Sequence, residues 1–246
     1  TVRELIWTAG PYIATMIFIV GMIWRYKFDR YGWTSRSSQM YESRLLRVGS
    51  PLFHFGILMA LGGHVMGLVI PKSWTERLGI SEHLYHVVAV AAGSIAGVMV
   101  ATGLSILIYR RRTVQRVFQV TTRMDKLMYV ILGIVTTLGI WNTIGINLLD
   151  LPNKYPGGYD YRESVSVWFR SIAYFNPKPE VMSEVPLSFQ LHAIAAMALM
   201  AIIPITRLVH VFSAPVGYLS RPYLVYRSRG ESKNIRRGWE PIQHRK

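Results

Sequence analysis

The sequence lacks cysteine and has few acidic residues. Its 246 residues include 13 Asp and Glu against 28 Lys and Arg, which gives a formal net charge of +15 at pH 7. The absence of cysteine excludes disulfides, thiolate nucleophiles, cysteine-ligated zinc and any iron–sulfur cluster held by this chain alone. Charged residues of both signs are also scarce, at 17%, whereas about 25% is usual in a soluble globular protein.

Apolar residues make up 51% of the chain, and this content excludes a disordered protein. A soluble nucleic-acid-binding protein would explain the charge but not the apolar content. The class that remains is an integral membrane protein with basic loops. Such a protein requires runs of about 20 apolar residues.

Five apolar runs meet this requirement. They do not alternate as barrel strands do, so each is expected to cross the membrane as an α-helix. The first is too long for the apolar region of a signal peptide, and we interpret it as a retained helix. The sequence therefore predicts an all-α integral membrane protein: one domain of residues 1–220, followed by a basic tail of residues 221–246. The five spans cover about residues 5–24, 51–70, 84–109, 127–149 and 187–212.

The basic residues gather on one side of these spans. Six lie between spans one and two, six between spans three and four, and nine from Arg207 onward, whereas the opposite side holds seven. The positive-inside rule then predicts an outer N-terminus and a cytoplasmic C-terminus. With the acidic residues included, the cytoplasmic side carries a net +16 and the outer side −1.

The longest loop on the predicted outer side contains a second helical pattern. Within residues 161–175, five bulky side chains recur at helical spacing: Tyr161, Val165, Trp168, Phe169 and Ile172. Trp and Tyr favour the level of the lipid headgroups, so we expect a short interfacial helix. A helix packed within the loop, without lipid contact, is an equally open alternative.

Four of the seven histidines lie in spans two and five. Ionisable groups inside a membrane are rare and usually functional. Because the two spans run in opposite directions, His54 is level with His210 near the cytoplasmic side, and His64 is level with His192 near the outer side. Two imidazoles that face one another can hold one haem iron from both axial positions. The pattern predicts two bis-histidine haem sites.

Two other interpretations stay open at this point. A membrane histidine can be an interhelical hydrogen-bond partner, and a histidine chain can be a proton pathway. A proton relay usually includes Asp or Glu, and we expect no buried carboxylate in the five spans. Glycines around the histidines of span two would let a flat porphyrin approach the backbone, although glycine also serves plain helix packing. They are Gly56, Gly62, Gly63 and Gly67.

The histidine spacing is unequal in the two spans. Ten residues separate His54 from His64, about 15 Å of helix, but eighteen separate His192 from His210, about 27 Å. This mismatch predicts that the two haem planes are not parallel. Pro204 is expected to bend span five and absorb part of the excess.

Several segments together resemble the gamma subunit of membrane-bound respiratory nitrate reductase, a di-haem cytochrome b. The resemblance runs over most of the chain, and only the combination of segments is specific. They are Tyr31-Gly-Trp33, Arg36-Ser-Ser-Gln39, Leu52–Leu58, Gly63-His64, Leu191-His192, and Arg207–His210 followed by Ser213–Leu219.

The resemblance implies a place in nitrate respiration at the bacterial plasma membrane. It implies two haem b groups, one held by His54 and His210 and the other by His64 and His192. Menaquinol or ubiquinol would be oxidised on the outer side. Electrons would pass to an iron–sulfur (beta) subunit and then to a molybdenum (alpha) subunit, which carries out the nitrate chemistry.

The quinol contacts are predicted near the outer end of span three. The family has a basic residue in this region, and here the matching position is Tyr85, with His86 beside it and Gly63 on span two. We favour His86 as the proton acceptor. Arg207 lies one helical turn before His210 and is expected to bind a haem propionate or to reach the headgroups instead.

Three other functions compete with this interpretation. One is a di-haem cytochrome b subunit of another quinone-linked reductase or dehydrogenase. The second is a transporter or channel with a histidine relay, and the third is a haem-free anchor. An absorption spectrum separates the two haem interpretations from the other two.

Overall fold

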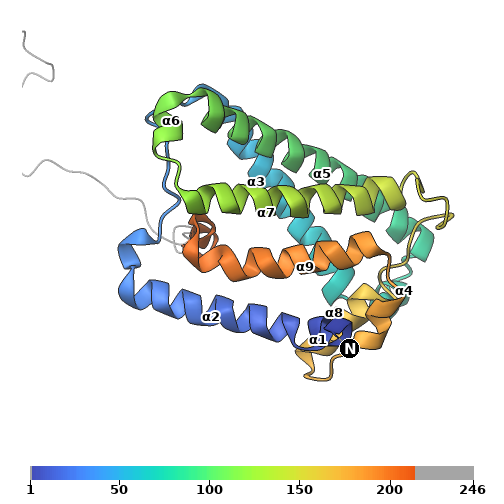
Figure 1. The fold of residues 1–246 in the computed structure, drawn as a ribbon. Helices are drawn as coiled ribbons and strands as arrows, with labels where there is room; N and C mark the ends of the chain where they lie inside the picture. The colour runs from blue at the N-terminus through green and yellow to red at the C-terminus, as the bar shows by residue number, and fades with distance from the viewer. Residues whose placement is uncertain (1, 214–246) are drawn as a thin grey trace, which may run out of the picture. The chain divides into compact units, whose positions relative to one another are not determined.

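The computed structural model describes residues 2–213, and within them all regular structure is helical (Figure 1). The helices are α1 (Val2–Thr8), α2 (Gly10–Phe28), α3 (Arg44–His64), α4 (Lys72–Arg77), α5 (Glu82–Thr113), α6 (Gln115–Gln119), α7 (Arg123–Ile140), α8 (Val165–Ala173) and α9 (Leu187–Ile202). Short segments extend or join them: the 3-10 helices η1 (Arg30–Gly32), η4 (Pro179–Ser183), η5 (Ile203–Ile205) and η6 (Arg207–Ser213), and the π-helices η2 (Val65–Val69) and η3 (Trp141–Ile146). The predicted tail, residues 221–246, and the domain boundary at 220 lie outside the described residues.

The prediction of an all-α membrane protein is confirmed. Four helical stretches are long and apolar enough to cross a membrane, namely residues 44–69, 82–113, 123–146 and 187–205. The fifth predicted span is a bent pair, α1 and α2, whose axes differ by 45°. The break falls at Ala9, two residues before Pro11, which is the second residue of α2. Proline cannot donate the backbone hydrogen bond that a continuous helix needs, so a bend at this point is expected.

The long helices pack in sequence across the bundle. α3 packs on α5, α5 on α7, α7 on α9, and α9 on α2. Within residues 2–213, α3 packs mainly on α5 and η2, and neither α9 nor α2 is among its main packing partners. The paired histidines belong to α3 on one side and to α9 and η6 on the other. These segments lie on separate parts of the bundle, so the contact between them is made by side chains.

Glycines permit the closest of these contacts. A Cβ built on Gly103 of α5 would lie 2.5 Å from the backbone nitrogen of Phe53 on α3, and one on Gly56 would lie 2.9 Å from the backbone nitrogen of Val100. α3 and α5 can approach this closely only because these positions have no side chain. Gly93 of α5 likewise packs on η3, where a Cβ built on Gly93 would lie 3.1 Å from the side chain of Thr143.

A cluster of buried hydrophobic residues lies at the end of the bundle that carries α8 (Figure 1). This end is called the α8 end, and the opposite end, which carries α6, is called the α6 end. Trp168 donates its indole N–H to the backbone carbonyl of Trp7, 2.9 Å away, and the two rings meet edge to face at 5.3 Å. Val165, Met182 and Val185 complete the cluster.

This cluster bears on the two interpretations of the loop helix. The predicted helix over residues 161–175 exists as α8; its Trp168 and Val165 face the cluster, and Phe169 on its other side is exposed. One face of α8 thus packs within the protein, as the packed alternative expects, and lipid contact of the exposed face stays a prediction.

Span five ends earlier than predicted. The sequence suggested one helix over residues 187–212, but α9 ends at Ile202 and is followed by η5 with the buried Pro204. Thr206 is then extended, with φ −112° and ψ 177°, and η6 begins at Arg207. The helix of span five therefore breaks at Pro204, where the sequence predicted a bend. That this break absorbs part of the excess length between His192 and His210 stays a prediction.

Candidate functional site

The four histidines of spans two and five form two pairs. The ring centres of His54 and His210 lie 6.2 Å apart, with 64° between the ring planes. Those of His64 and His192 lie 6.0 Å apart, with 19° between the planes. These are the pairs expected from the sequence, and each pair bridges α3 to the chain segment of α9 and η6.

Backbone hydrogen bonds fix the tautomer of three of these rings. Nδ1 of His54 lies 2.7 Å from the Ser50 carbonyl, and Nδ1 of His64 lies 2.6 Å from the Ala60 carbonyl. The Nδ1 of His210 is bonded in the same way to the Arg207 carbonyl. A carbonyl can only accept, so each Nδ1 carries the proton and each Nε2 keeps its lone pair, as a metal-ligating histidine requires.

The separation of the rings fits a metal ion held between them. Metal–imidazole bonds of about 2.0 Å, with about 1.1 Å from the nitrogen to the ring centre, put two axial ring centres about 6.2 Å apart. Among residues 2–213, no three His, Asp or Glu side chains gather at one point. Two protein ligands per site suit haem, because the porphyrin supplies the other four.

The surface beside His64 also fits a flat, bulky group. Cβ atoms built on Gly62 and Gly63 would meet no atom within 4 Å, and Leu58 and Leu61 are well exposed beside them. Not every nearby glycine is open: Gly67 packs under the hydroxyl of Tyr161. The open positions are Gly62 and Gly63, the two residues that precede His64.

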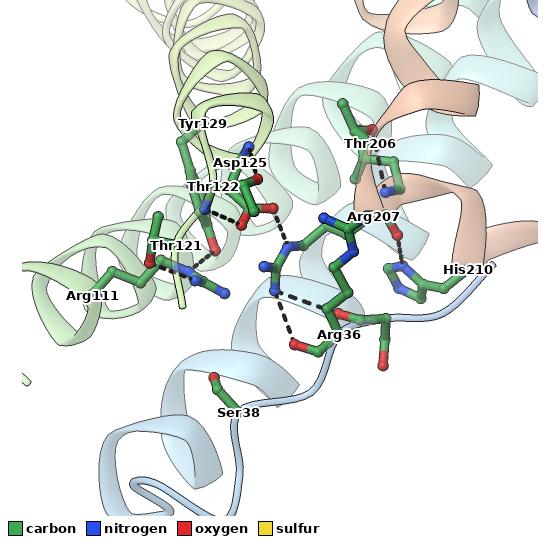
Figure 2. A network of polar contacts seen from close by, with 12 residues as sticks. Arg36, Ser38, Arg111, Thr121, Thr122, Asp125, Tyr129, Thr206, Arg207 and His210 are labelled. Carbon is green, nitrogen blue, oxygen red and sulfur yellow. Dashed lines mark hydrogen bonds and ion pairs between the residues drawn. The ribbon is translucent and has the colours of Figure 1, made fainter. Parts of the chain in front are cut away.

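Arg207 is held by a buried carboxylate. Its Nε donates to Oδ1 of Asp125 over 2.8 Å, and the two side chains are 11% and 1% exposed (Figure 2). This pair corrects the expectation that the spans contain no buried carboxylate, because α7 begins at Arg123 and includes Asp125 in its first turn. The contact of Arg207 with a propionate stays a prediction.

A second buried arginine fixes the loop between α2 and α3. Arg110, 1% exposed, donates to Glu42 Oε2 over 2.6 Å and to both the hydroxyl and the carbonyl of Ser38 over 2.8 Å each. Burial raises the pKa of Glu42, but hydrogen bonds from the Leu45 N–H and from Arg110 outweigh it and hold that pKa below its usual value. The loop is thus tied to the α6 end of α5.

The predicted quinol residues lie near the α8 end but not in one contact group. Tyr85 and His86 are in the first two turns of α5, and both are partly buried. His86 sits beneath Gly158: a Cβ there would lie 2.3 Å from its Nε2, which has no hydrogen-bond partner within residues 2–213. Gly63 faces the open surface beside His64 instead.

A cation beside Tyr85 escaped the sequence prediction. The Arg162 guanidinium lies 3.8 Å from the centre of the Tyr85 ring and also donates to the Thr75 hydroxyl over 3.0 Å. No sequence signal links two residues that lie so far apart, one in a loop and one in a helix. Burial, and then the neighbouring Tyr85, raise the pKa of Tyr161 above its usual value.

Comparison with known proteins shows the family of the chain. Residues 3–229 match the nitrate reductase gamma subunit family. The chain belongs to this family. The nitrate reductase gamma chain of Bacillus subtilis is 43% identical over 226 residues, covering 92% of this chain and 98% of its own length. The respiratory nitrate reductase 2 gamma chain of Escherichia coli is 34% identical over 220 residues, covering 89% and 94%.

A longer relative of the gamma subunit family matches more closely in sequence. The nitrate reductase-like protein NarX of Mycobacterium tuberculosis is 52% identical over 240 residues, or 96% of this chain. The match covers only 36% of NarX, so the chain spans about a third of that relative. The gamma chains of the other two organisms, in contrast, are matched over almost their whole length.

Proposed function

We propose that this chain is the membrane anchor and electron-transfer subunit of a respiratory nitrate reductase in the bacterial plasma membrane. It oxidises menaquinol or ubiquinol on its outer side and passes the electrons inward through two haem b groups. The observation that carries the proposal is the pair of His–His separations, 6.2 and 6.0 Å, in a chain of the gamma subunit family.

The chain's own residues have separate tasks in this function. His54 and His210 hold one haem, and His64 and His192 hold the other. Haem bound by two imidazoles has no open coordination position, so it supplies one-electron transfer and does not bind substrate. The two ligand pairs lie at different levels along α3, with His54 in the middle of the helix and His64 at its end, and they divide the thickness of the membrane into shorter steps.

Quinol oxidation needs a proton acceptor at the first of these steps. His86 lies near the start of α5 with a buried Nε2 that lacks a partner in the described part of the chain, and the Arg162 cation lies beside Tyr85. An imidazole is well suited to accept a proton near neutral pH. We assign this role to His86, with Tyr85 and Gly63 as the further contacts expected from the sequence.

The partners follow from the charge and from the missing cysteine. The side predicted to face the cytoplasm carries a net +16, and this offers a docking face for the partner that receives the electrons. The chain has no cysteine for an iron–sulfur cluster, so that cluster belongs to a beta subunit. The nitrate chemistry then belongs to a molybdenum-containing alpha subunit.

An absorption spectrum of the full chain in detergent tests the proposal. Two haems per chain, reducible by a menaquinol or ubiquinol analogue, are expected. A purified, folded chain without a Soret band would overturn both haem interpretations. Two haems that are reduced by quinol but pass no electrons to nitrate in the assembled complex would favour the alternative, a di-haem cytochrome b subunit of another quinone-linked reductase or dehydrogenase.

The role of His86 is tested by replacing it with glutamine, which cannot take up the proton. We expect quinol-driven reduction of the haems to slow about 100-fold, because a positioned base contributes at least this factor. The haem content should stay at two per chain. Stopped-flow spectroscopy measures both quantities in one sample.

The matched control for this variant is His83→Gln, since His83 is an exposed histidine three residues earlier on α5. It should reduce its haems at the normal rate. An unchanged rate in His86→Gln would reject the assignment of His86 as proton acceptor.

A further inference from the structure

η6 carries His210 but has little structure of its own to hold it. It is a 3-10 helix of seven residues, separated from α9 by η5 and the extended Thr206, and within the described chain its main backbone packing is on the short segment η5. Short 3-10 segments have poor hydrogen-bond geometry and depend on their surroundings. Side-chain contacts must therefore fix the position of His210.

The strongest polar contact of η6 is the ion pair of its first residue. The Nε of Arg207 donates to Asp125 over 2.8 Å, and its Nη1 donates to the carbonyls of Ser35 and Arg36 over 3.4 Å each (Figure 2). The carbonyl of Arg207 is in turn the group that accepts from Nδ1 of His210. One residue thus links the ring of His210 to the side chain of Asp125.

Asp125 is itself rigidly held. Its Oδ2 accepts from the Thr122 N–H over 2.9 Å, and the Thr122 hydroxyl accepts from the Asp125 N–H over 3.1 Å, which forms a capping box at the start of α7. The carboxylate is 1% exposed, so solvent cannot replace the arginine as its partner. A charge held in this way gives Arg207 one fixed position.

The geometry points to Asp125 as a positioning residue for the haem at the α6 end. It touches neither haem nor substrate, and acts through Arg207 and the backbone of η6 on the ring of His210. The inference rests on the proposed function for the identity of the ligand pair. It goes beyond that function by extending the site to α7, which contributes no ligand.

Asp125→Asn tests the inference, because it removes the charge and keeps an oxygen for the cap. Residues that orient a metal-ligating histidine typically change affinity by about 10-fold or more. We expect the haem at the α6 end to bind about 10-fold more weakly, while the haem held by His64 and His192 is retained. Electron paramagnetic resonance and redox titration of the full chain distinguish the two haems.

The matched control is Glu42→Gln, which makes the same charge-to-amide change in the other buried ion pair of the α6 end, with Arg110. It should keep both haems. Arg207→Lys preserves the charge and is expected to retain more of the affected haem than Asp125→Asn does. The double variant, which combines Asp125→Asn with Arg207→Gln, should weaken haem binding by less than the two single effects combined, because both changes break the link between Asp125 and Arg207.

A haem-free measurement keeps the test independent of the proposed function. In the apo chain, hydrogen exchange at residues 206–213 should be faster in Asp125→Asn than in wild type, and unchanged in Glu42→Gln. Equal loss of both haems in Asp125→Asn, or wild-type exchange in η6, would overturn the positioning role. A wild-type chain that binds no haem would instead overturn the proposed function, and the exchange data would still decide whether Asp125 anchors η6.

Discussion

Replacing His64 with alanine is expected to leave one haem per chain instead of two and to stop reduction by quinol. An axial histidine supplies one of the two protein bonds to its iron, and alanine offers no replacement. The partner ring of His192, 6.0 Å away, would be left to bind alone. The Soret absorbance per chain should fall by about half.

The pairing itself predicts a pattern across four variants. His64→Ala and His192→Ala should lose the same haem, and the double variant should lose nothing further, because the pair acts as one site. His54→Ala and His210→Ala should lose the other haem but keep reduction of the remaining one by quinol. Potentiometric titration with optical detection identifies which haem is missing in each case.

A control for this series is His83→Ala, which removes an imidazole from outside both pairs. It should keep two haems with wild-type spectra. If His64→Ala kept both haems, or if His64→Ala and His192→Ala lost different ones, the pairing of α3 with α9 would be wrong.

The helices themselves could be predicted from the sequence because the membrane leaves few alternatives. Backbone groups without water must bond within their own segment, so a long apolar run indicates a helix. The pairing of histidines followed from the opposite directions of two such helices. What the apolar runs could not indicate was where the helices end.

Polar contacts decide those ends, and they depend on residues distant in sequence. α5 continues to Thr113 instead of ending near 109, since Arg110 is buried against Glu42 and Ser38 from another loop. The start of α7 at Arg123 had a local signal in Thr122 and Asp125, the two residues of its capping box. The partner of Asp125, Arg207, lies 82 residues away and had no such signal.

The glycines of α3 also show which features the sequence predicts and which it does not. Gly56 and Gly63 are seven residues apart on α3 and were both expected to make room for haem. Gly56 instead contacts the backbone of α5, whereas Gly63 faces open space. Seven residues are about two helical turns, so the two glycines lie on nearly the same face of α3. What separates their roles is how far along α3 the helix α5 lies against it, and a single sequence does not reveal that packing.

Gly103→Ala is expected to destabilise the protein, although alanine is the better helix former. A Cβ at this position would lie 2.5 Å from the backbone nitrogen of Phe53 and 2.9 Å from the carbonyl oxygen of Gly49. Backbone atoms cannot rotate away as a side chain can, so α3 and α5 must separate. Overpacking of this kind costs about 1–3 kcal/mol, more than the roughly 1 kcal/mol that alanine gains over glycine in a helix.

The matched control is Gly133→Ala in α7, where a Cβ would meet no atom within 4 Å of it in the described structure. Both variants share the change in helix propensity, so the difference between their unfolding temperatures in detergent reports the packing of α3 on α5. Gly133→Ala should be as stable as wild type or slightly more stable. Gly103→Ala should unfold at a clearly lower temperature.

The same variant couples this packing to the proposed site. Phe53, the residue against which the new methyl group would press, directly precedes His54. A displacement of α3 at Phe53 moves the ring of His54 away from His210, whereas His64 lies about three helical turns further along. Gly103→Ala should therefore lose the haem of His54 and His210 more readily on heating than the haem of His64 and His192. Equal loss of both would mean that α3 moves as a rigid rod and that the close crossing at Gly103 does not set the position of His54.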